Sequence, residues 1–167
     1  IRGFVIQNFN KSGVLVQSTG NTIAGNYIGL DADGSTITAN NVSNASYSGG
    51  IRVETNNNTI GGLTAADRNV ISGNGYAGIV LVDASSNQIL GNYIGTDASG
   101  TLDRGNLQEG IDINRGGSNI IGGANVNARN IISGNDSDGM EIDGSDNNVI
   151  QGNYIGTDVT GTLDLGN

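Results

Sequence analysis

The stretch Asn69–Asn74, which reads Asn-Val-Ile-Ser-Gly-Asn, recurs as Asn-Ile-Ile-Ser-Gly-Asn at Asn130–Asn135, 61 residues further along the chain. A second motif, Asn-Tyr-Ile-Gly, occurs three times with separations of 66 and 61 residues, at Asn26–Gly29, Asn92–Gly95 and Asn153–Gly156. Self-similarity at a fixed period is typical of repeat proteins, in which each unit packs on its neighbours along the chain. The sequence therefore predicts a repeat architecture with a large unit of 61 to 66 residues.

Each large unit divides into two smaller ones. The pattern Gly-(Val/Ile/Met)-x-(Val/Leu/Ile) recurs at intervals of 37, 28, 32 and 29 residues, at Gly13, Gly50, Gly78, Gly110 and Gly139. Asn-x-Ile motifs supply two more apolar positions in each small unit. Apolar residues at alternate positions, bounded by Gly or Asn, fit strands of three to five residues and do not fit a helical period. Each small unit is therefore predicted to hold three short strands, and no helix is predicted.

Three short strands per unit, at nearly constant spacing, predict one coil of a parallel β-helix, in which each strand pairs with its copy in the next coil. Aligning the units gives the residues that should stack as inward columns. Two columns belong to the first strand: Val14, Ile51, Ile79, Ile111 and Met140, then Val16, Val53, Leu81, Ile113 and Ile142. The columns of the second and third strands are Ile23, Ile60, Ile89, Ile121 and Ile150, then Ile28, Ile71, Ile94, Ile132 and Ile155.

Asparagine and glycine should form columns of their own. Stacked asparagine amides can hydrogen-bond the copies above and below them, and two such columns are predicted at the strand entries. They begin at Asn21 and Asn26. A glycine column at the corner after the second strand should adopt positive φ. Its members are Gly25, Gly62, Gly91, Gly123 and Gly152.

The predicted fold class is therefore all-β, a parallel β-helix solenoid in which residues 1–167 form one segment. About five coils at ~4.8 Å per coil give a solenoid about 25 Å long. Neither end shows a polar cap, and solenoids normally need such caps. We therefore expect the segment to belong to a longer chain or to associate end to end with further copies.

The composition excludes much catalytic chemistry. The 167 residues include no Cys, His, Pro or Trp, so disulfides, thiolate or imidazole metal sites and Ser-His-Asp or Cys-His nucleophiles are absent. Sixteen acidic and seven basic residues give a formal charge of −9, which repels nucleic acid. No run of eighteen apolar residues occurs, so membrane insertion is not expected either.

The motif Gly-Asn-Tyr-Ile-Gly-Thr-Asp-x-x-Gly-Thr, at Gly91–Thr101 and Gly152–Thr162, resembles repeats of a known group. With Asn-Val-Ile-Ser-Gly-Asn and Gly-Ile-x-Ile, it makes the whole chain similar to right-handed parallel β-helix repeat proteins of the pectate-lyase-like superfamily, in particular the bacterial secreted or cell-surface, adhesin-like group. The resemblance implies a right-handed solenoid and a secreted or surface location. Because the superfamily also contains pectate lyases, polysaccharide hydrolases, uronate epimerases and phage tailspikes, it implies polysaccharide as a partner without choosing an activity.

Outward positions of the first strand carry the sharpest acidic feature. Asp112 and Glu141 should lie in neighbouring coils about 5 Å apart, with Asp143 beside them. Such a separation suits a retaining glycosidase pair. The alternative is a solvated acidic face, since two exposed like charges at that distance cost only ~1 kcal/mol in water. A hydrolase is favoured over a lyase or epimerase, because those enzymes need Arg, Lys or calcium beside the base and the arginines fall on different faces or coils.

Loops after the third strand of alternate coils carry acidic turns. Asp31, Asp33, Asp97 and Asp158 stand near glycines in these loops, and clustered oxygen ligands of this kind can bind calcium. The alternative is an Asp-Gly turn whose carboxylate accepts hydrogen bonds from nearby backbone N–H groups. Calcium is the one cofactor that the sequence suggests.

The regular repetition favours a noncatalytic structural or adhesive segment that presents its strand faces and loops to glycans or to surface proteins. Enzymes usually depart from their own regularity where chemistry occurs, and no such break stands out in the sequence. The alternative is a polysaccharide-active hydrolase that uses Asp112, Glu141 and Asp143.

Overall fold

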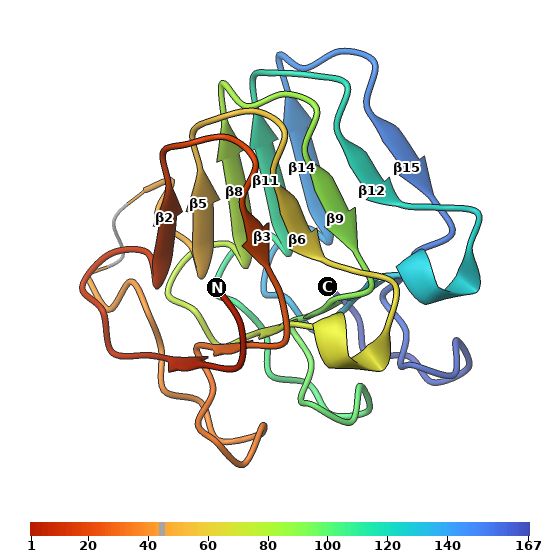
Figure 1. Cartoon of the computed structure of the whole chain (residues 1–167). Coiled ribbons are helices and arrows are strands. Elements are labelled where there is room, and N and C mark those ends of the chain that lie inside the picture. The colour runs from red at the N-terminus through yellow and green to blue at the C-terminus, as the bar shows by residue number, and fades with distance from the viewer. Residues whose placement is uncertain (44–45) are drawn as a thin grey trace.

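The computed structural model describes residues 1–43 and 46–167, and its regular structure consists almost entirely of short parallel strands. The strands form three sheets, each containing one strand from every coil (Figure 1). Sheet 1 contains β2 (Val14–Val16), β5 (Ile51–Val53), β8 (Ile79–Val82), β11 (Ile111–Asn114) and β14 (Met140–Asp143). Sheet 2 contains β3 (Thr22–Ile23), β6 (Thr59–Gly61), β9 (Gln88–Leu90), β12 (Ile120–Gly122) and β15 (Val149–Gln151). Sheet 3 contains β1 (Val5–Ile6), β4 (Tyr27–Ile28), β7 (Val70–Ile71), β10 (Tyr93–Ile94), β13 (Ile131–Ile132) and β16 (Tyr154–Ile155).

The chain passes through the three sheets in turn and returns to the first one coil later, so the predicted parallel β-helix of about five coils is confirmed. Its register is the predicted one. Ile79 pairs with Ile51 on one side and Ile111 on the other, and Ile60 pairs with Ile89 in sheet 2. Because alternate side chains of a strand point to opposite faces, these columns fill the interior and form one continuous aliphatic core.

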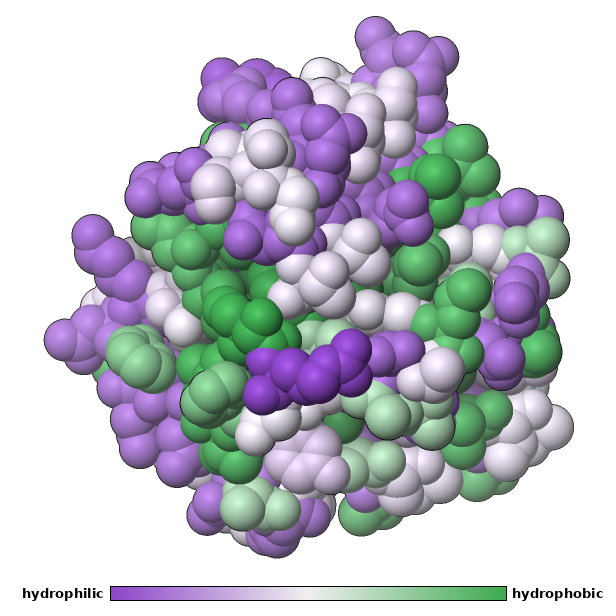
Figure 2. Space-filling view, viewed as in Figure 1, coloured by the Kyte–Doolittle hydropathy of each residue, from purple (hydrophilic) through white to green (hydrophobic). Residues whose placement is uncertain are grey.

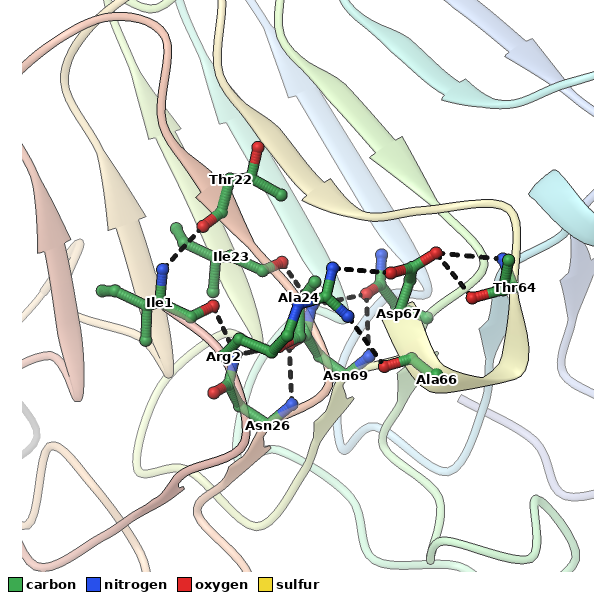
Figure 3. A network of polar contacts seen from close by, with 11 residues as sticks. Ile1, Arg2, Thr22, Ile23, Ala24, Asn26, Thr64, Ala66, Asp67 and Asn69 are labelled. Carbon is green, nitrogen blue, oxygen red and sulfur yellow. Dashed lines mark hydrogen bonds and ion pairs between the residues drawn. The ribbon is translucent and has the colours of Figure 1, made fainter.

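The two predicted asparagine columns are confirmed as hydrogen-bonded ladders. In each link, the backbone N–H and the side-chain Nδ2 of one asparagine donate to the Oδ1 of the asparagine in the next coil. Figure 3 shows such a link, in which Nδ2 of the buried Asn26 donates to Oδ1 of Asn69 at 2.9 Å, beside the ion pair of Arg2 with Asp67. Buried amides must find partners, and the ladder supplies them without side chains of another kind.

A third ladder was not predicted. It runs between sheet 3 and sheet 1 through Asn40, Asn74, Asn106, Asn135 and Asn167, with the same direction of donation. These asparagines do not precede an Asn-x-Ile motif, so the alignment of apolar positions passed over them. Each coil therefore has an asparagine at all three of its corners.

The predicted glycine column is correct for three coils and wrong for two. Gly25, Gly91 and Gly152 have positive φ, of 66°, 67° and 72°. In the other coils the residue one position earlier takes that conformation, at Gly61 with φ 88° and Gly122 with φ 81°. These two coils continue from the corner into three-residue 3₁₀ helices, η1 (Ala65–Asp67) and η2 (Val126–Ala128), so their corner is shifted. The prediction that the chain has no helix was wrong to that extent, and both helices stand out in Figure 1.

The loops after sheet 3 in alternate coils are small hairpins. Antiparallel bridges close them between Leu30 and Ile37, Thr96 and Asp103, and Thr157 and Asp164. They hang below the solenoid in the view of Figure 1 and stack on one another, since successive hairpins are joined by backbone hydrogen bonds. A second apolar cluster lies beneath them, formed by Leu30, Val70, Tyr93 and Ile131 with Tyr27 and Tyr154 packed against it. The hairpins thus add an ordered outer layer to sheet 3.

The core is not equally covered along the axis. Ile113 in β11 is 0% exposed, whereas its neighbour Ile142 in β14 is 44% exposed. Apolar surface also appears in the view of Figure 2, where green side chains gather around the position of the N-terminus and hydrophilic side chains surround them. None of the helices in the described part of the chain is long and apolar enough to cross a bilayer.

Candidate functional site

The outer face of sheet 1 brings the predicted carboxylates together. Asp112 in β11 pairs in register with Glu141 in β14, and Asn114 pairs with Asp143. On its other side Asp112 pairs with Val80 of β8. Outward-facing residues of paired strands stack side by side, so Asp112, Glu141 and Asp143 occupy adjacent positions on one face, as predicted.

Asp112 differs from its neighbours because it is buried. It is 2% exposed and Val80 is 0% exposed, whereas Glu141 and Asp143 are exposed. The chain preceding the strands of sheet 1 folds over this face, and the backbone of Gly49 lies against the side chain of Val80. A uniformly solvated acidic face, the alternative given by the sequence, does not describe the position of Asp112.

Burial changes the acidity of Asp112. Desolvation, followed by the charges of Glu109, Glu141 and Asp143, raises the pKa of its carboxyl from 3.8 to about 7. A buried carboxyl among like charges holds its proton because the ionised form loses hydration and is repelled. Asp112 is therefore a carboxylic acid whose protonation changes near neutral pH.

Glu109 is a member of the site that sequence reasoning missed. It precedes Gly110, is 6% exposed, and its Oε2 atom is buried without a hydrogen-bond partner among the described residues. Desolvation, with the charges of Glu141 and Asp138, raises the pKa of Glu109. The signal was available, because Glu109 and Asp138 occupy the same position before the repeated glycine, and Gly110 donates its N–H to the Asp138 carbonyl oxygen.

Two tyrosines border the carboxylates. The rings of Tyr47 and Tyr76 have centroids 6.2 Å apart, and Asn114 Nδ2 donates to the Tyr47 hydroxyl at 3.4 Å. Desolvation, followed by the charges of Asp112 and Glu109, raises the pKa of Tyr76, which locates its ring beside both carboxyls. Neither tyrosine was singled out from the sequence, because both lie in loops outside the strand alignment.

The loop of Tyr47 is held in an unusual conformation. Tyr47 has a φ of 56°, which non-glycine residues rarely adopt. Arg52 donates from NH1 to the Tyr47 carbonyl oxygen at 2.8 Å and from Nε to Glu54 at 2.8 Å. A depression of about 350 Å³ lies beside this contact and includes Lys11 and Ser48. The face therefore changes along the axis from two cationic residues to a group of carboxylates.

The carboxylates suggested for calcium lie in the stacked hairpins and are occupied by local donors. Asp31 accepts a hydrogen bond from the N–H of Ala32. Hydrogen bonds from Thr36 and Ser35 lower the pKa of Asp33 to about 2. Asp97 and Asp158 each accept hydrogen bonds from a hydroxyl and from backbone N–H groups of their own hairpin, with these donors: Ser99, Thr101 and Leu102 for Asp97, and Thr160, Thr162 and Leu163 for Asp158.

These contacts are those of the turn alternative. Burial acts to raise the pKa of Asp97 and of Asp158, but the hydrogen bonds outweigh it and hold both values below the ordinary range. Within residues 1–43 and 46–167, no group of three or more acidic side chains is arranged to hold a metal ion. Calcium binding by Asp31, Asp33, Asp97 and Asp158 stays a prediction.

A second surface lies on the outer face of sheet 3. Arg68 stacks over the ring of Tyr93, with Cζ 4.2 Å from the ring centroid, and Arg129 stacks over Tyr154 at 3.9 Å. Two shallow grooves of about 390 and 230 Å³ flank Arg68, one on the side of Tyr27 and the other on the side of Tyr93. The arginines cover the rings, so this surface repeats with the two-coil unit and contains no carboxylate cluster.

Comparison with protein-family models, with curated proteins and with solved structures gave no match to this chain. The geometry of the outer face of sheet 1 and the chemistry of its residues therefore carry the functional argument.

Proposed function

We propose that this chain is a noncatalytic solenoid segment of a secreted or cell-surface bacterial protein and that it binds a glycan on the outer face of sheet 1. The observation that carries the proposal is the pair of tyrosine rings, Tyr47 and Tyr76, beside polar side chains on a sheet whose register runs unbroken through every described coil. Aromatic rings offer sugar rings an apolar surface, while neighbouring carboxylates and amides accept or donate hydrogen bonds.

The rigidity of the face supports binding of an extended polymer. Parallel strands in register and a core without polar residues fix the positions of the surface side chains before a ligand arrives, which lowers the entropic cost of binding. The resemblance to surface proteins of the pectate-lyase-like superfamily agrees with this function. A surface protein in place of the glycan, and end-to-end self-association, belong to the same proposal.

A polysaccharide panel tests the proposal. Neutral, acidic and amino-sugar polymers are scored both for binding and for new reducing or unsaturated ends, with calcium and with chelator. Binding without new ends is the expected result. Tyr76→Ala should weaken binding at least several-fold, since base or sugar platforms lose most of their contact area with the ring, whereas Tyr154→Ala on sheet 3 should not. Equal binding by both variants would place the ligand elsewhere.

The second candidate function is hydrolysis of a glycosidic bond. Its specific support is the pairing of Asp112, whose pKa is raised to about 7, with the exposed carboxylate of Glu141. A retaining glycosidase needs one carboxylic acid that donates a proton to the leaving oxygen and a second carboxylate that attacks the anomeric carbon. In this candidate Asp112 is the acid, Glu141 is the nucleophile, and Asp143 supports the charge of the site.

Turnover in the panel would favour this second candidate. Asp112→Asn and Glu141→Gln should then each lower the rate at least a hundredfold, because each removes a group that acts at the reacting bond. Full activity in either variant would remove the assignment.

A further inference from the structure

The carboxylates around Asp112 have no cationic partner in the protein. Among the described residues the ion pairs are Arg2–Asp67, Arg52–Glu54 and Arg115–Asp83, and none includes Glu109, Asp112, Asp138, Glu141 or Asp143. These five residues, called the carboxylate cluster below, come from two strands and the two loops that precede them. Like charges held this close repel one another unless protons or a cation neutralise them.

Glu109 adds an observation that is independent of charge. Its Oε2 is buried and accepts no hydrogen bond, although a buried acceptor normally has a partner. Among the charges near Asp112, that of Glu109 is the strongest, so the unpartnered carboxylate is directed into the cluster. A missing donor at this position is what a bound N–H group would supply.

The surroundings narrow the kind of donor. The described residues hold no three acidic side chains arranged for a metal ion, so the cluster lacks the geometry for a bare divalent cation. Two tyrosine rings stand at its border, and the faces of such rings attract ammonium groups. Carboxylates with adjacent aromatic faces together form a site for an organic ammonium ion.

We propose that the carboxylate cluster, bordered by Tyr47 and Tyr76, binds the ammonium group of an unacetylated amino sugar in a glycan chain. The inference rests on the proposed glycan-binding function and narrows the glycan to a cationic one. The ammonium group donates hydrogen bonds to Glu109 Oε2 and to the carboxyl of Asp112, while the sugar ring lies against the tyrosines. Glu141 and Asp143, which are exposed, attract neighbouring amino sugars of the same chain.

The test compares two oligosaccharides that differ only at nitrogen. A hexamer of β-1,4-linked glucosamine carries ammonium groups, and its fully N-acetylated counterpart is neutral. Calorimetric titration of the intact chain should show binding of the glucosamine hexamer and at least tenfold weaker binding of the acetylated one. Glu109→Gln should weaken binding of the cationic hexamer about tenfold or more, since a hydrogen bond to a charged group is lost.

Asp83→Asn is the matched control. It removes the same charge from the end of a sheet 1 strand, but Asp83 is exposed and already paired with Arg115 at 3.0 Å. Its affinity should equal that of the unaltered protein, and circular dichroism should show both variants folded. Asp112→Asn serves as a second probe of the cluster if Glu109→Gln fails to fold.

Three results would overturn the inference. Equal affinity for both hexamers would mean that the site reads the sugar and not its charge, and glycan binding itself would stand. Equal losses in Glu109→Gln and Asp83→Asn would indicate attraction to net charge alone. Binding of neither hexamer would also refute it, and the polysaccharide panel would then decide separately whether the chain binds any glycan.

Discussion

Asp112 and Glu141 are neighbours in one column of sheet 1, yet only Asp112 is buried. Strand pairing placed both residues correctly from the sequence, because register depends only on the repeat. Burial depends on the loops that fold over the face, and their path has no repeat pattern. The same reason accounts for Glu109, whose unpartnered oxygen gives the site its character and which the sequence analysis did not select.

Replacing Asp112 tests the cause of its raised pKa. The carboxyl has a value near 3.8 when unfolded and about 7 when folded, so the folded state keeps a proton that the unfolded state has released between these pH values. The free energy of unfolding should therefore fall as pH rises through that window, by about 4 kcal/mol in total. Asp112→Asn should flatten this slope and unfold at higher urea concentration than the unaltered protein at pH 8. An unchanged slope from pH 4 to 8 would contradict the assignment.

The asparagine ladders can be tested at a central link. Asn92 accepts from Asn69 through Oδ1 and donates through Nδ2 to Asn130 and to the Ile60 carbonyl. Asn92→Asp keeps the shape but directs an oxygen at two acceptors inside the core, so the free energy of unfolding should fall by about 3 kcal/mol or more. The exposed Asn127→Asp is the control and should change it by less than about 0.5 kcal/mol. Similar values for both variants would mean that the ladder contributes little.

Strands and corners divide into a part that the sequence predicts and a part that it does not. The three strands per coil follow from apolar residues at alternate positions, and every predicted column is confirmed. The shifted corners at Gly61 and Gly122 follow instead from η1 and η2, whose three-residue turns have no period to reveal them. The stacked hairpins were expected as protruding loops, because contacts between loops two coils apart depend on backbone hydrogen bonds and not on residue type.

The stacking of Arg68 on Tyr93 joins the corner after η1 to sheet 3 and can be measured as a coupling. A double-mutant cycle with Arg68→Leu and Tyr93→Leu should give an interaction free energy of about 1 kcal/mol, since the pair is partly desolvated beneath the hairpins. The equivalent cycle with Arg129 and Tyr154 should give a smaller value because Tyr154 is less buried. Additive losses in the first cycle would show that the two side chains only fill space.

Across the whole molecule, each coil is stabilised by the coils on either side of it. Solenoids behave in this way because a unit contacts only its neighbours, so stability varies with position along the axis. The central strands of sheet 1 have a coil above and below, whereas β14 has the described chain on one side only. The same residue type in the same column therefore has different energetic weight in different coils.

Ile113 and Ile142 provide the matched comparison. They pair in register, but the first is 0% and the second 44% exposed in this chain. Ile113→Ala should lower the free energy of unfolding by about 2 to 5 kcal/mol, because it opens a cavity that the rigid columns cannot close. Ile142→Ala should cost about 1 kcal/mol or less, as little surface is removed from water there. Equal losses in urea titrations would indicate that the last coil is covered in solution.

All three asparagine ladders donate in the same direction, from each coil to the next along the chain. Their amide dipoles therefore add, much as peptide dipoles add along a helix, and the solenoid has an electrical polarity that its formal charges do not reveal. Any cross-section presents N–H groups on the face toward the C-terminus and oxygens on the opposite face. A neighbouring coil, whatever chain it comes from, fits such a face in one orientation only, so the amides act as a directional key for assembly.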